Sequence, residues 1–236
     1  EAGHYRHLPR SEPMSIALSW SSGKDAAWAL HLLRQQGHDV SMLITTVTRD
    51  FDRVAIHGVR RSVLRQQAAR VDLPLLEVEL PWPCSNDLYE FAMGAALARL
   101  KEREDISAVA FGDLFLADVR IYRERLLAPH GLEPLFPLWG MRTDLLMRNM
   151  IRAGVVANVV SLDPAKVPSR FAGWAIDRSF LDALPPEVDP CGENGEFHTV
   201  VSDGPMFASP VPLIPGEIVE RDGFVYADFR TTAVPE

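Results

Sequence analysis

A short stretch near the start of the sequence combines small residues, a lysine and an aspartate in an order that suits phosphate binding. Residues 21–25 read SSGKD, and they follow an apolar run at residues 15–20. Serine hydroxyls and a lysine ammonium can donate hydrogen bonds to phosphate, whereas the aspartate can cap a helix or bind Mg²⁺. The order is not that of a Walker A motif, because Leu18 occupies the position of its first glycine. From this stretch alone, phosphate binding and an ordinary capped turn are equally good interpretations.

A second stretch, residues 192–199, reads GENGEFHT and holds the other side chains that could do chemistry. Glu193, Glu196 and His198 could serve as metal ligands, general bases or hydrogen-bond acceptors. A tight turn with solvated acids is the alternative, and it is the better interpretation of this stretch taken alone. A zinc site is disfavoured, because no cluster of histidines and cysteines has ligand spacing. The neighbouring Cys191 could be a nucleophile, although a partly buried structural thiol is the more frequent role of such a residue.

The residues around the first stretch predict the elements that would hold it in place. The apolar run at residues 15–20 is typical of a buried strand, and the alanine- and leucine-rich residues 26–36 are typical of a helix. Residues 21–25 therefore form the turn between a strand and the N-terminus of a helix. That end of a helix presents free N–H groups and a partial positive charge, which favour phosphate.

Strand and helix patterns continue to alternate through the first half of the sequence. Further strands are predicted at residues 40–46, 75–80 and 107–111, and helices at residues 59–71, 86–103 and 118–127. This alternation predicts an α/β fold with a parallel sheet and helices on both of its faces. In such sheets ligands bind at the carboxyl ends of the strands, where residues 21–25, Thr45-Thr46 and Gly112-Asp113 would meet. Their convergence predicts a single nucleotide site.

The second half of the sequence lacks the regular alternation of strands and helices. It predicts a helix at residues 144–153, a strand at residues 155–162, a short helix near residues 179–184 and a hairpin at residues 217–230. We therefore expect a nucleotide-binding domain at residues 14–125 and a substrate domain at residues 126–236. Residues 1–13 are polar and are interpreted as a leader or an unstructured extension.

Composition limits the classes of protein that this sequence can be. The 236 residues carry a net charge of −8 and no block of lysines and arginines, which argues against a protein that coats nucleic acid. The two cysteines, Cys84 and Cys191, form no disulfide framework, so a reducing cytoplasm is the expected compartment. No apolar run approaches the length needed to span a membrane.

Residues 21–26 resemble the phosphate loop of the PP-loop ATP pyrophosphatases, usually written SGGxDS, with Ser22 in place of a glycine and Ala26 in place of a serine. Four further motifs make the sequence similar to the diphthine–ammonia ligase family, from about residue 14 to residue 207. In order they are FGD at residues 111–113, PLW at residues 137–139, CGENGEFHT at residues 191–199 and DGPMF at residues 203–207. All five motifs occur in the family's order, although Asn194 stands where the family commonly has a glycine.

The resemblance implies a fold, an activity and cofactors. The fold would be a parallel five-stranded Rossmann-like sheet of the adenine nucleotide alpha hydrolase-like type, with helices on both faces and a smaller C-terminal α+β substrate domain. The protein would be an ATP-dependent ligase that uses ATP and Mg²⁺ to adenylate a carboxylate, releases pyrophosphate and forms an amide with ammonia. The family's named substrate is diphthine, but the sequence leaves open which carboxylate this chain takes and whether it is protein-borne.

The resemblance also implies roles for individual residues. The catalytic set would be Lys24, Asp25, Asp113, Glu193, Glu196 and His198, with Asp25 as the candidate Mg²⁺ ligand. The nucleotide would be bound by Ser19, Trp20, Ser21, Ser22, Gly23, Lys24, Asp25, Ala26, Ile44, Thr45, Thr46, His57, Gly112 and Asp113. Arg120 and Arg123, one helical turn apart, are predicted either to meet a phosphate or carboxylate or to lie on a solvated helix face.

Two other functions are compatible with the sequence. A PP-loop RNA-modifying enzyme would be expected to have a basic surface or an RNA-binding appendage, and the acidic charge balance argues against it. A non-catalytic module would bind ATP or AMP without releasing pyrophosphate, and Ser22 and Ala26 keep that interpretation open. The expected partners are ATP, ammonia and a carboxylate substrate, with a homodimer left open and neither a membrane nor a nucleic acid expected.

Overall fold

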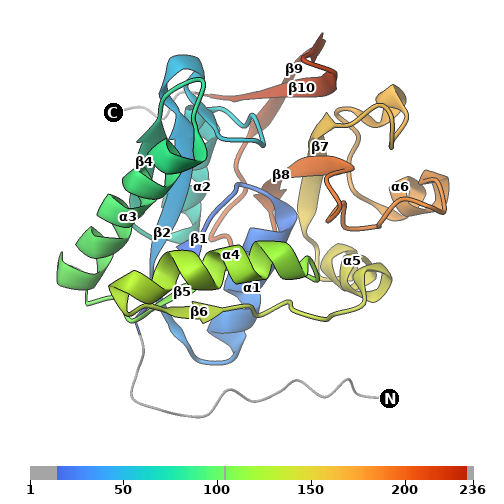
Figure 1. Ribbon diagram of the computed structural model, residues 1–236. Coiled ribbons are helices and arrows are strands. Elements are labelled where there is room, and N and C mark those ends of the chain that lie inside the picture. The colour runs from blue at the N-terminus through green and yellow to red at the C-terminus, as the bar shows by residue number, and fades with distance from the viewer. Residues whose placement is uncertain (1–14, 104, 233–236) are drawn as a thin grey trace.

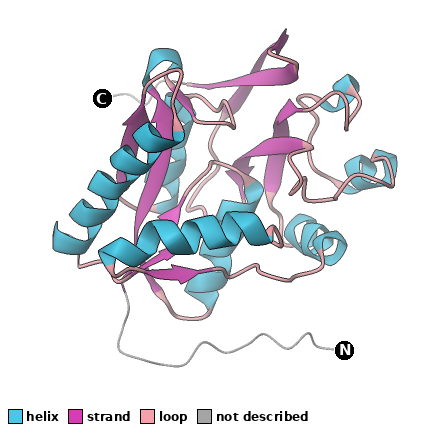
Figure 2. Ribbon diagram, viewed as in Figure 1, coloured by secondary structure: helices cyan, strands magenta, loops and turns pink. Residues whose placement is uncertain are grey.

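The computed structural model describes residues 15–103 and 105–232, and it has two β-sheets with helices packed around them (Figure 1). The leader expected at residues 1–13 lies outside the described residues. Figure 2 shows the strands of both sheets in magenta and the helices that flank the larger sheet in cyan. None of the described helices has both the length and the apolar character needed to cross a membrane.

The larger sheet contains five parallel strands, so the parallel sheet predicted from the alternation of strands and helices and the five strands implied by the resemblance are both confirmed. Their order is β4-β2-β1-β5-β6, and the two-residue strand β3 pairs antiparallel with the end of β2. The strands are β1 (Ser15–Ser19), β2 (Asp39–Thr48), β3 (Arg53–Val54), β4 (Leu75–Leu80), β5 (Ala108–Ala110) and β6 (Glu133–Leu135). Strand β6 was not predicted, because it is three residues long and contains Pro134. It continues the larger sheet past residue 125, where we expected the nucleotide-binding domain to end.

Alternating side chains of β1 divide the core between the two faces of the larger sheet. Ile16 and Leu18 are buried on the face covered by helices α1 (Lys24–Gln35) and α2 (Arg61–Val71). Ala17 is buried on the opposite face, together with apolar residues of helices α3 (Asn86–Arg103) and α4 (Ala117–Leu127). The prediction of helices on both faces is therefore confirmed, and the carboxyl ends of the strands are the place for a ligand.

The smaller sheet is antiparallel, with the strand order β8-β7-β10-β9. Its strands are β7 (Val156–Leu162), β8 (Phe197–Asp203), β9 (Leu213–Arg221) and β10 (Phe224–Thr231). Helices α5 (Thr143–Arg152) and α6 (Arg178–Ala183) lie near β7 and β8 in Figure 1. The hairpin predicted around Asp222-Gly223 is confirmed as β9 and β10. Three short 3-10 turns complete the described elements: η1 (Arg49–Phe51), η2 (Ala128–His130) and η3 (Ser169–Phe171).

Strand β8 brings the second stretch of the sequence against the first. A turn was the expected structure of residues 192–199, but strand β8 begins within them, at Phe197. The Val201 N–H donates a hydrogen bond to the Ser22 carbonyl at 2.9 Å. Apolar residues of β8, α1 and α2 belong to one buried cluster, so the smaller sheet packs on the helices that follow the phosphate loop.

Candidate active site

The loop between β1 and α1 turns at Ser22, which has a left-handed backbone with a φ of +69°. This conformation costs a non-glycine residue about 1 kcal/mol, so other contacts must stabilise it. The Ser22 carbonyl accepts hydrogen bonds from the Val201 N–H and, at 3.1 Å, from the Gln67 side chain. Gln67 is fully buried on α2, and it also donates to the Val201 carbonyl and accepts from the Trp20 indole. A serine can therefore occupy a position where the related loop has glycine.

Helix α1 is capped by a neighbouring strand, because its own N-cap residue is a glycine without a side chain. The Lys24 N–H donates to Thr199 Oγ1 of β8 at 3.1 Å. The N–H groups of Asp25 and Ala26 have no hydrogen-bond acceptor on another described residue. Gly112 lies so close to this turn that a Cβ there would approach the Ala26 nitrogen to 2.9 Å. The first turn of α1 therefore presents free N–H groups next to the end of β5, as an anion site requires.

Lys24 and Asp25 form an ion pair at the start of α1, in which the Lys24 side chain is buried and the Asp25 side chain is 26% exposed. The Lys24 Nζ lies 2.9 Å from Asp25 Oδ2, donates to the Cys191 carbonyl and faces the Phe197 ring. Burial alone would lower the pKa of Lys24, but the charges around it, with Asp25 first among them, together outweigh burial and leave that pKa raised. Burial raises the pKa of Asp25, and the lysine charge offsets only part of this effect. The charged lysine therefore links the phosphate loop to the loop at Cys191.

Glu193 connects the second stretch to the end of β5. Its Oε1 accepts hydrogen bonds from the Leu114 N–H at 2.7 Å and from the Phe115 N–H at 3.4 Å. Burial raises the pKa of this carboxyl to about 7, although the Leu114 N–H opposes the increase. Near neutral pH the carboxyl is therefore divided between its neutral and ionised forms, as suits a group that accepts or donates a proton.

Glu196 shapes its own loop. Its Oε1 accepts hydrogen bonds from the Asp189 N–H at 3.1 Å and from the Asn194 side chain at 3.0 Å. The second oxygen, Oε2, is buried and has no hydrogen-bond partner among the described residues. The chain thus uses Glu196 to hold the turn that presents Glu193.

His198 and His57 lie against each other, with ring centroids 4.3 Å apart. Burial lowers the pKa of His198 to about 4, and burial together with the neighbouring His198 lowers the pKa of His57 well below its usual value of 6.5. Both rings are therefore neutral at pH 7. His57 lines the cavity described next, whereas His198 supports His57 from β8.

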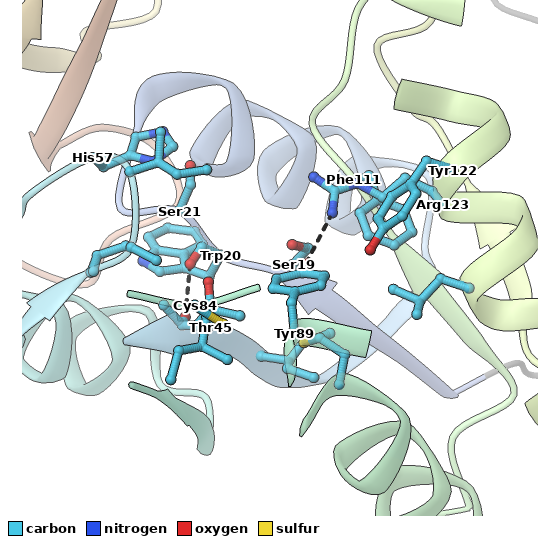
Figure 3. A pocket seen from close by; sticks show the side chains of 18 of the residues that line it. Ser19, Trp20, Ser21, Thr45, His57, Cys84, Tyr89, Phe111, Tyr122 and Arg123 are labelled. Carbon is cyan, nitrogen blue, oxygen red and sulfur yellow. Dashed lines mark hydrogen bonds between the residues drawn. The ribbon is translucent and has the colours of Figure 1, made fainter. Parts of the chain in front are cut away.

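A cavity of about 660 Å³ lies at the carboxyl ends of β1 and β2 (Figure 3), and its volume is that of a typical small-molecule site. The predicted nucleotide-binding residues that line it are Ser19, Trp20, Ser21, Ile44, Thr45, Thr46 and His57. The other predicted site residues do not line it: Ser22, Gly23, Lys24, Asp25, Ala26, Gly112, Asp113, Glu193, Glu196 and His198. These residues instead form the phosphate loop, the start of α1 and the loops packed behind them. The structure thus brings seven of the predicted nucleotide-binding residues to the cavity, and the roles of all the predicted site residues stay predictions.

The other end of the cavity is rich in aromatic residues, and this feature was not predicted. Figure 3 shows Tyr89 opposite Tyr122 and Arg123, on the side of the cavity away from His57. The Arg123 guanidinium lies 4.9 Å from the centre of the Phe111 ring and 3.5 Å from an Asp113 carboxylate oxygen. Burial raises the pKa of Asp113, and the Arg123 charge partly offsets this.

Three residues near the site were missed in the sequence, and only one of them, Gln67, could have been recognised there. Gln67 left a signal, because it is a polar residue on the apolar face of a predicted amphipathic helix that includes Val63 and Leu64. Tyr89 and Tyr122 left none, since aromatic residues in a helix are as typical of a core as of a ligand site.

The residues at the start of α1 fit a magnesium ion that arrives with a nucleotide. No group of three or more histidines, cysteines or acids within the described residues could hold a metal ion. Mg²⁺ at nucleotide sites needs only one or two carboxylates, because phosphate oxygens and water complete its coordination. Asp25 Oδ1 is buried without a hydrogen-bond partner among the described residues, so it is available as the carboxylate ligand of Mg²⁺.

Comparisons with known proteins agree with the motifs. Residues 14–134 match the model described as the diphthamide synthase N-terminal domain, and residues 142–225 match the diphthamide synthase C-terminal domain. A diphthine–ammonia ligase of Schizosaccharomyces pombe is 26% identical over 85% of this chain and 36% of that protein. The Homo sapiens protein of that name is 27% identical over 60% of this chain and 53% of that protein. The chain thus spans between about a third and about half of the length of these two relatives.

One further relative is matched over most of its length, and one solved structure is similar over part of this chain. The Rattus norvegicus diphthine–ammonia ligase is 26% identical over 91% of this chain and 88% of that protein. A solved structure described as a predicted subunit of a tRNA methyltransferase from Methanocaldococcus jannaschii has a TM-score of 0.40 and 18% identity over 61% of this chain and 77% of that one.

Proposed function

The chain belongs to the diphthamide synthase family, and we propose that it is an ATP-dependent ligase that adenylates a carboxylate and then forms an amide with ammonia. The observation that carries the proposal is the position of the phosphate loop at the edge of the cavity. Ser21 lines the cavity, and the free N–H groups of Asp25 and Ala26 lie in the same loop and first helical turn. A nucleotide in the cavity would therefore reach an anion site with its phosphates.

In the first step of the proposed reaction, a carboxylate oxygen of the substrate attacks the α-phosphorus of ATP. The bond from that phosphorus to the bridging oxygen breaks, and pyrophosphate leaves. The free N–H groups at the start of α1 and the charge of Lys24 stabilise the developing pyrophosphate. Ile44, Thr45 and His57 line the part of the cavity that would hold the nucleoside. Mg²⁺ would neutralise phosphate charge, with Asp25 as its protein ligand.

In the second step, ammonia attacks the acyl carbon, AMP leaves and the new amide nitrogen loses a proton. Glu193 is the proposed acceptor, because burial raises its pKa to about 7 and it lies beside the residues that follow β5. Glu196 and His198 take positioning roles, since one shapes the loop of Glu193 and the other stacks on His57.

The proposal extends to the two domains, the substrate, the compartment and the oligomeric state. Residues 14–125 would supply the cavity and the phosphate loop, and residues 126–236 the second stretch that completes the site. The substrate would be an unidentified carboxylate, which a protein could carry, in a cytoplasmic reaction. A homodimer stays a prediction, to be checked by light scattering.

The test measures ATP binding by calorimetry, and pyrophosphate release with ammonium and a panel of carboxylates. We expect release that depends on a carboxylate, and a loss of at least tenfold in Lys24→Met, which keeps the length of the buried side chain. Glu193→Gln should bind ATP normally and form at least tenfold less amide.

Each alternative function has its own outcome in this experiment. ATP binding without pyrophosphate release under any condition would favour a non-catalytic nucleotide-binding module. Release that depends on added RNA would favour an RNA-modifying enzyme. Thermal unfolding of both variants shows whether a loss of activity is a loss of fold.

A further inference from the structure

Arg123 stands out in the cavity because most of its hydrogen-bonding capacity is unused. Its Nε lies 3.5 Å from Asp113 Oδ2 and its Nη1 lies 3.5 Å from the Tyr89 hydroxyl, which are both long contacts. Its Nη2 donates to none of the residues that the structure describes. A guanidinium has five N–H donors in a planar fork that matches a carboxylate, so this group has donors left for a ligand.

Aromatic side chains form much of the wall around Arg123, although the polar residues Asn86 and Asp118 also line the cavity. Phe111 lies under the guanidinium, and Tyr89, Met93 and Tyr122 line the same end of the cavity. The rings of Tyr89 and Tyr122 have centroids 6.3 Å apart. Aromatic walls of this kind bury an apolar group and hold its orientation.

A short chain of contacts connects Arg123 to the phosphate loop. Arg123 pairs with Asp113, which directly follows Gly112. Gly112 in turn packs on the backbone of Asp25 and Ala26, where the first turn of α1 begins. These contacts link Arg123 to the first turn of α1, where the pyrophosphate site is proposed.

We infer that Arg123 binds the carboxylate that is to be adenylated, and that Tyr89, Phe111 and Tyr122 hold an apolar or aromatic acyl group attached to it. The inference rests on the proposed function and adds the class of its acyl substrate. The guanidinium offsets the repulsion between the substrate carboxylate and the α-phosphate while the two approach. It takes no part in the bond changes, so Arg123 is a substrate-binding residue.

Arg120 on the same helix supplies a matched control. Its guanidinium lies over the rings of Phe136 and Trp139, at 4.9 Å and 4.8 Å, and it pairs with Glu124. Arg120 does not line the cavity. Replacing it removes the same charge from the same helix without touching the inferred subsite.

The experiment measures the binding of 4-phenylbutyrate and of its neutral amide by calorimetry. The protein is first loaded with Mg²⁺ and α,β-methylene ATP, in which the bond that would release pyrophosphate cannot be cleaved. In the wild type and Arg120→Ala we expect the carboxylate to bind at least tenfold more tightly than the amide. Arg123→Ala should abolish that preference and leave nucleotide affinity unchanged, and Arg123→Lys should restore part of it.

Several outcomes would overturn the inference while leaving the proposed function intact. One is an Arg123→Ala variant that keeps the preference for the carboxylate. Another is a wild type that binds the nucleotide but does not bind 4-phenylbutyrate at concentrations up to about 20 mM. A third is an Arg120→Ala variant that loses the preference for the carboxylate as fully as Arg123→Ala does. A loss of nucleotide affinity in Arg123→Ala would instead assign Arg123 to ATP. A wild type that does not bind the nucleotide contradicts the proposed function itself.

Discussion

Ser22 carries two local costs at the centre of the phosphate loop. Its φ of +69° is left-handed, and its hydroxyl is buried without a partner among the described residues. Glycine has no penalty in that conformation and no hydroxyl to desolvate, although it adds entropy to the unfolded chain. We expect Ser22→Gly to raise the free energy of unfolding by about 1 kcal/mol, measured by urea denaturation.

Ser21→Gly is the control for this prediction, because Ser21 has no left-handed backbone and its hydroxyl accepts a hydrogen bond from the Gly23 N–H. That variant should be destabilised. If Ser22→Gly were also less stable than the wild type, the Ser22 hydroxyl would have to make a bond that outweighs the backbone strain.

Glu193 should give the protein a pH-dependent stability. Its pKa is about 7 in the folded chain, mainly through burial, and its usual value is 4.5. Between these values the folded state holds a proton that the unfolded state has lost, so stability is complete below pH 4.5 and falls as the pH rises to 7. Glu193→Gln should flatten this slope and should be about 1 kcal/mol more stable than the wild type at pH 8, since partial exposure screens the effect.

Urea denaturation at pH 5, 6, 7 and 8 measures the slope directly. Glu193→Ala serves as the comparison, because it lacks the oxygen that accepts from the Leu114 N–H, whereas glutamine keeps one. Equal pH slopes in the wild type and Glu193→Gln would mean that the carboxyl titrates normally and is a poor candidate for the proton acceptor.

At the scale of elements, the contact between β5 and α1 decides whether the phosphate loop forms. A Cβ on Gly112 would lie 2.9 Å from backbone atoms of Asp25 and Ala26, which is closer than real Cβ atoms approach other atoms. Either the residues after β5 or the start of α1 would have to move. Gly112→Ala should therefore cost about 2 kcal/mol of stability and lower ATP affinity at least tenfold. Calorimetry and urea denaturation measure the two effects.

Gly94→Ala tests whether the effect of Gly112→Ala is specific to its position. Gly94 lies in α3, where a Cβ would meet only His130 atoms at 3.6 Å, an ordinary contact. Alanine there should stabilise the helix by about 1 kcal/mol and leave ATP affinity unchanged. Normal ATP binding by Gly112→Ala would show that the loop tolerates a shift of α1.

The elements that the sequence predicted are those whose residues repeat with a clear period. Strand β1 and helix α1 were predicted because apolar residues recur over their length, and the turn between them was marked by its small residues. Strand β6 was too short to show a period, and glycines at positions 192 and 195 made the start of β8 resemble a loop. The cavity wall at Tyr89 and Tyr122 depends on how α3 packs beside α4, which no local pattern encodes.

At the scale of the whole molecule, the C-terminal hairpin holds the loop of His57, which forms one wall of the cavity. Asp228 of β10 accepts hydrogen bonds from Arg53 and Arg60, at 2.8 to 3.1 Å, and Arg53 also donates to the Gly58 carbonyl. These arginines bracket the loop that carries His57 into the cavity. The Tyr226 side chain packs on Gly58, so the hairpin contacts this loop twice.

Asp228 is therefore expected to position the loop that carries His57, without itself lining the cavity. In Asp228→Ala the two arginines would lose their shared carboxylate and repel each other, and the loop would sample conformations in which His57 leaves the cavity. ATP affinity should fall threefold to tenfold, while pyrophosphate release at saturating ATP stays within twofold of the wild type. Asp228→Glu should recover most of the affinity.

A merely structural role for Asp228 would give a different combination of results. It would lower the midpoint of thermal unfolding and leave the ATP affinity of the folded molecules unchanged, as measured by calorimetry below the transition. Asp222→Ala, in the exposed turn of the same hairpin, controls for changes in the hairpin itself. Because Asp228 lies in β10 and its partners Arg53 and Arg60 follow β2, a dependence of ATP affinity on Asp228 would mean that the proposed nucleotide site is completed only when the hairpin has folded onto the larger sheet.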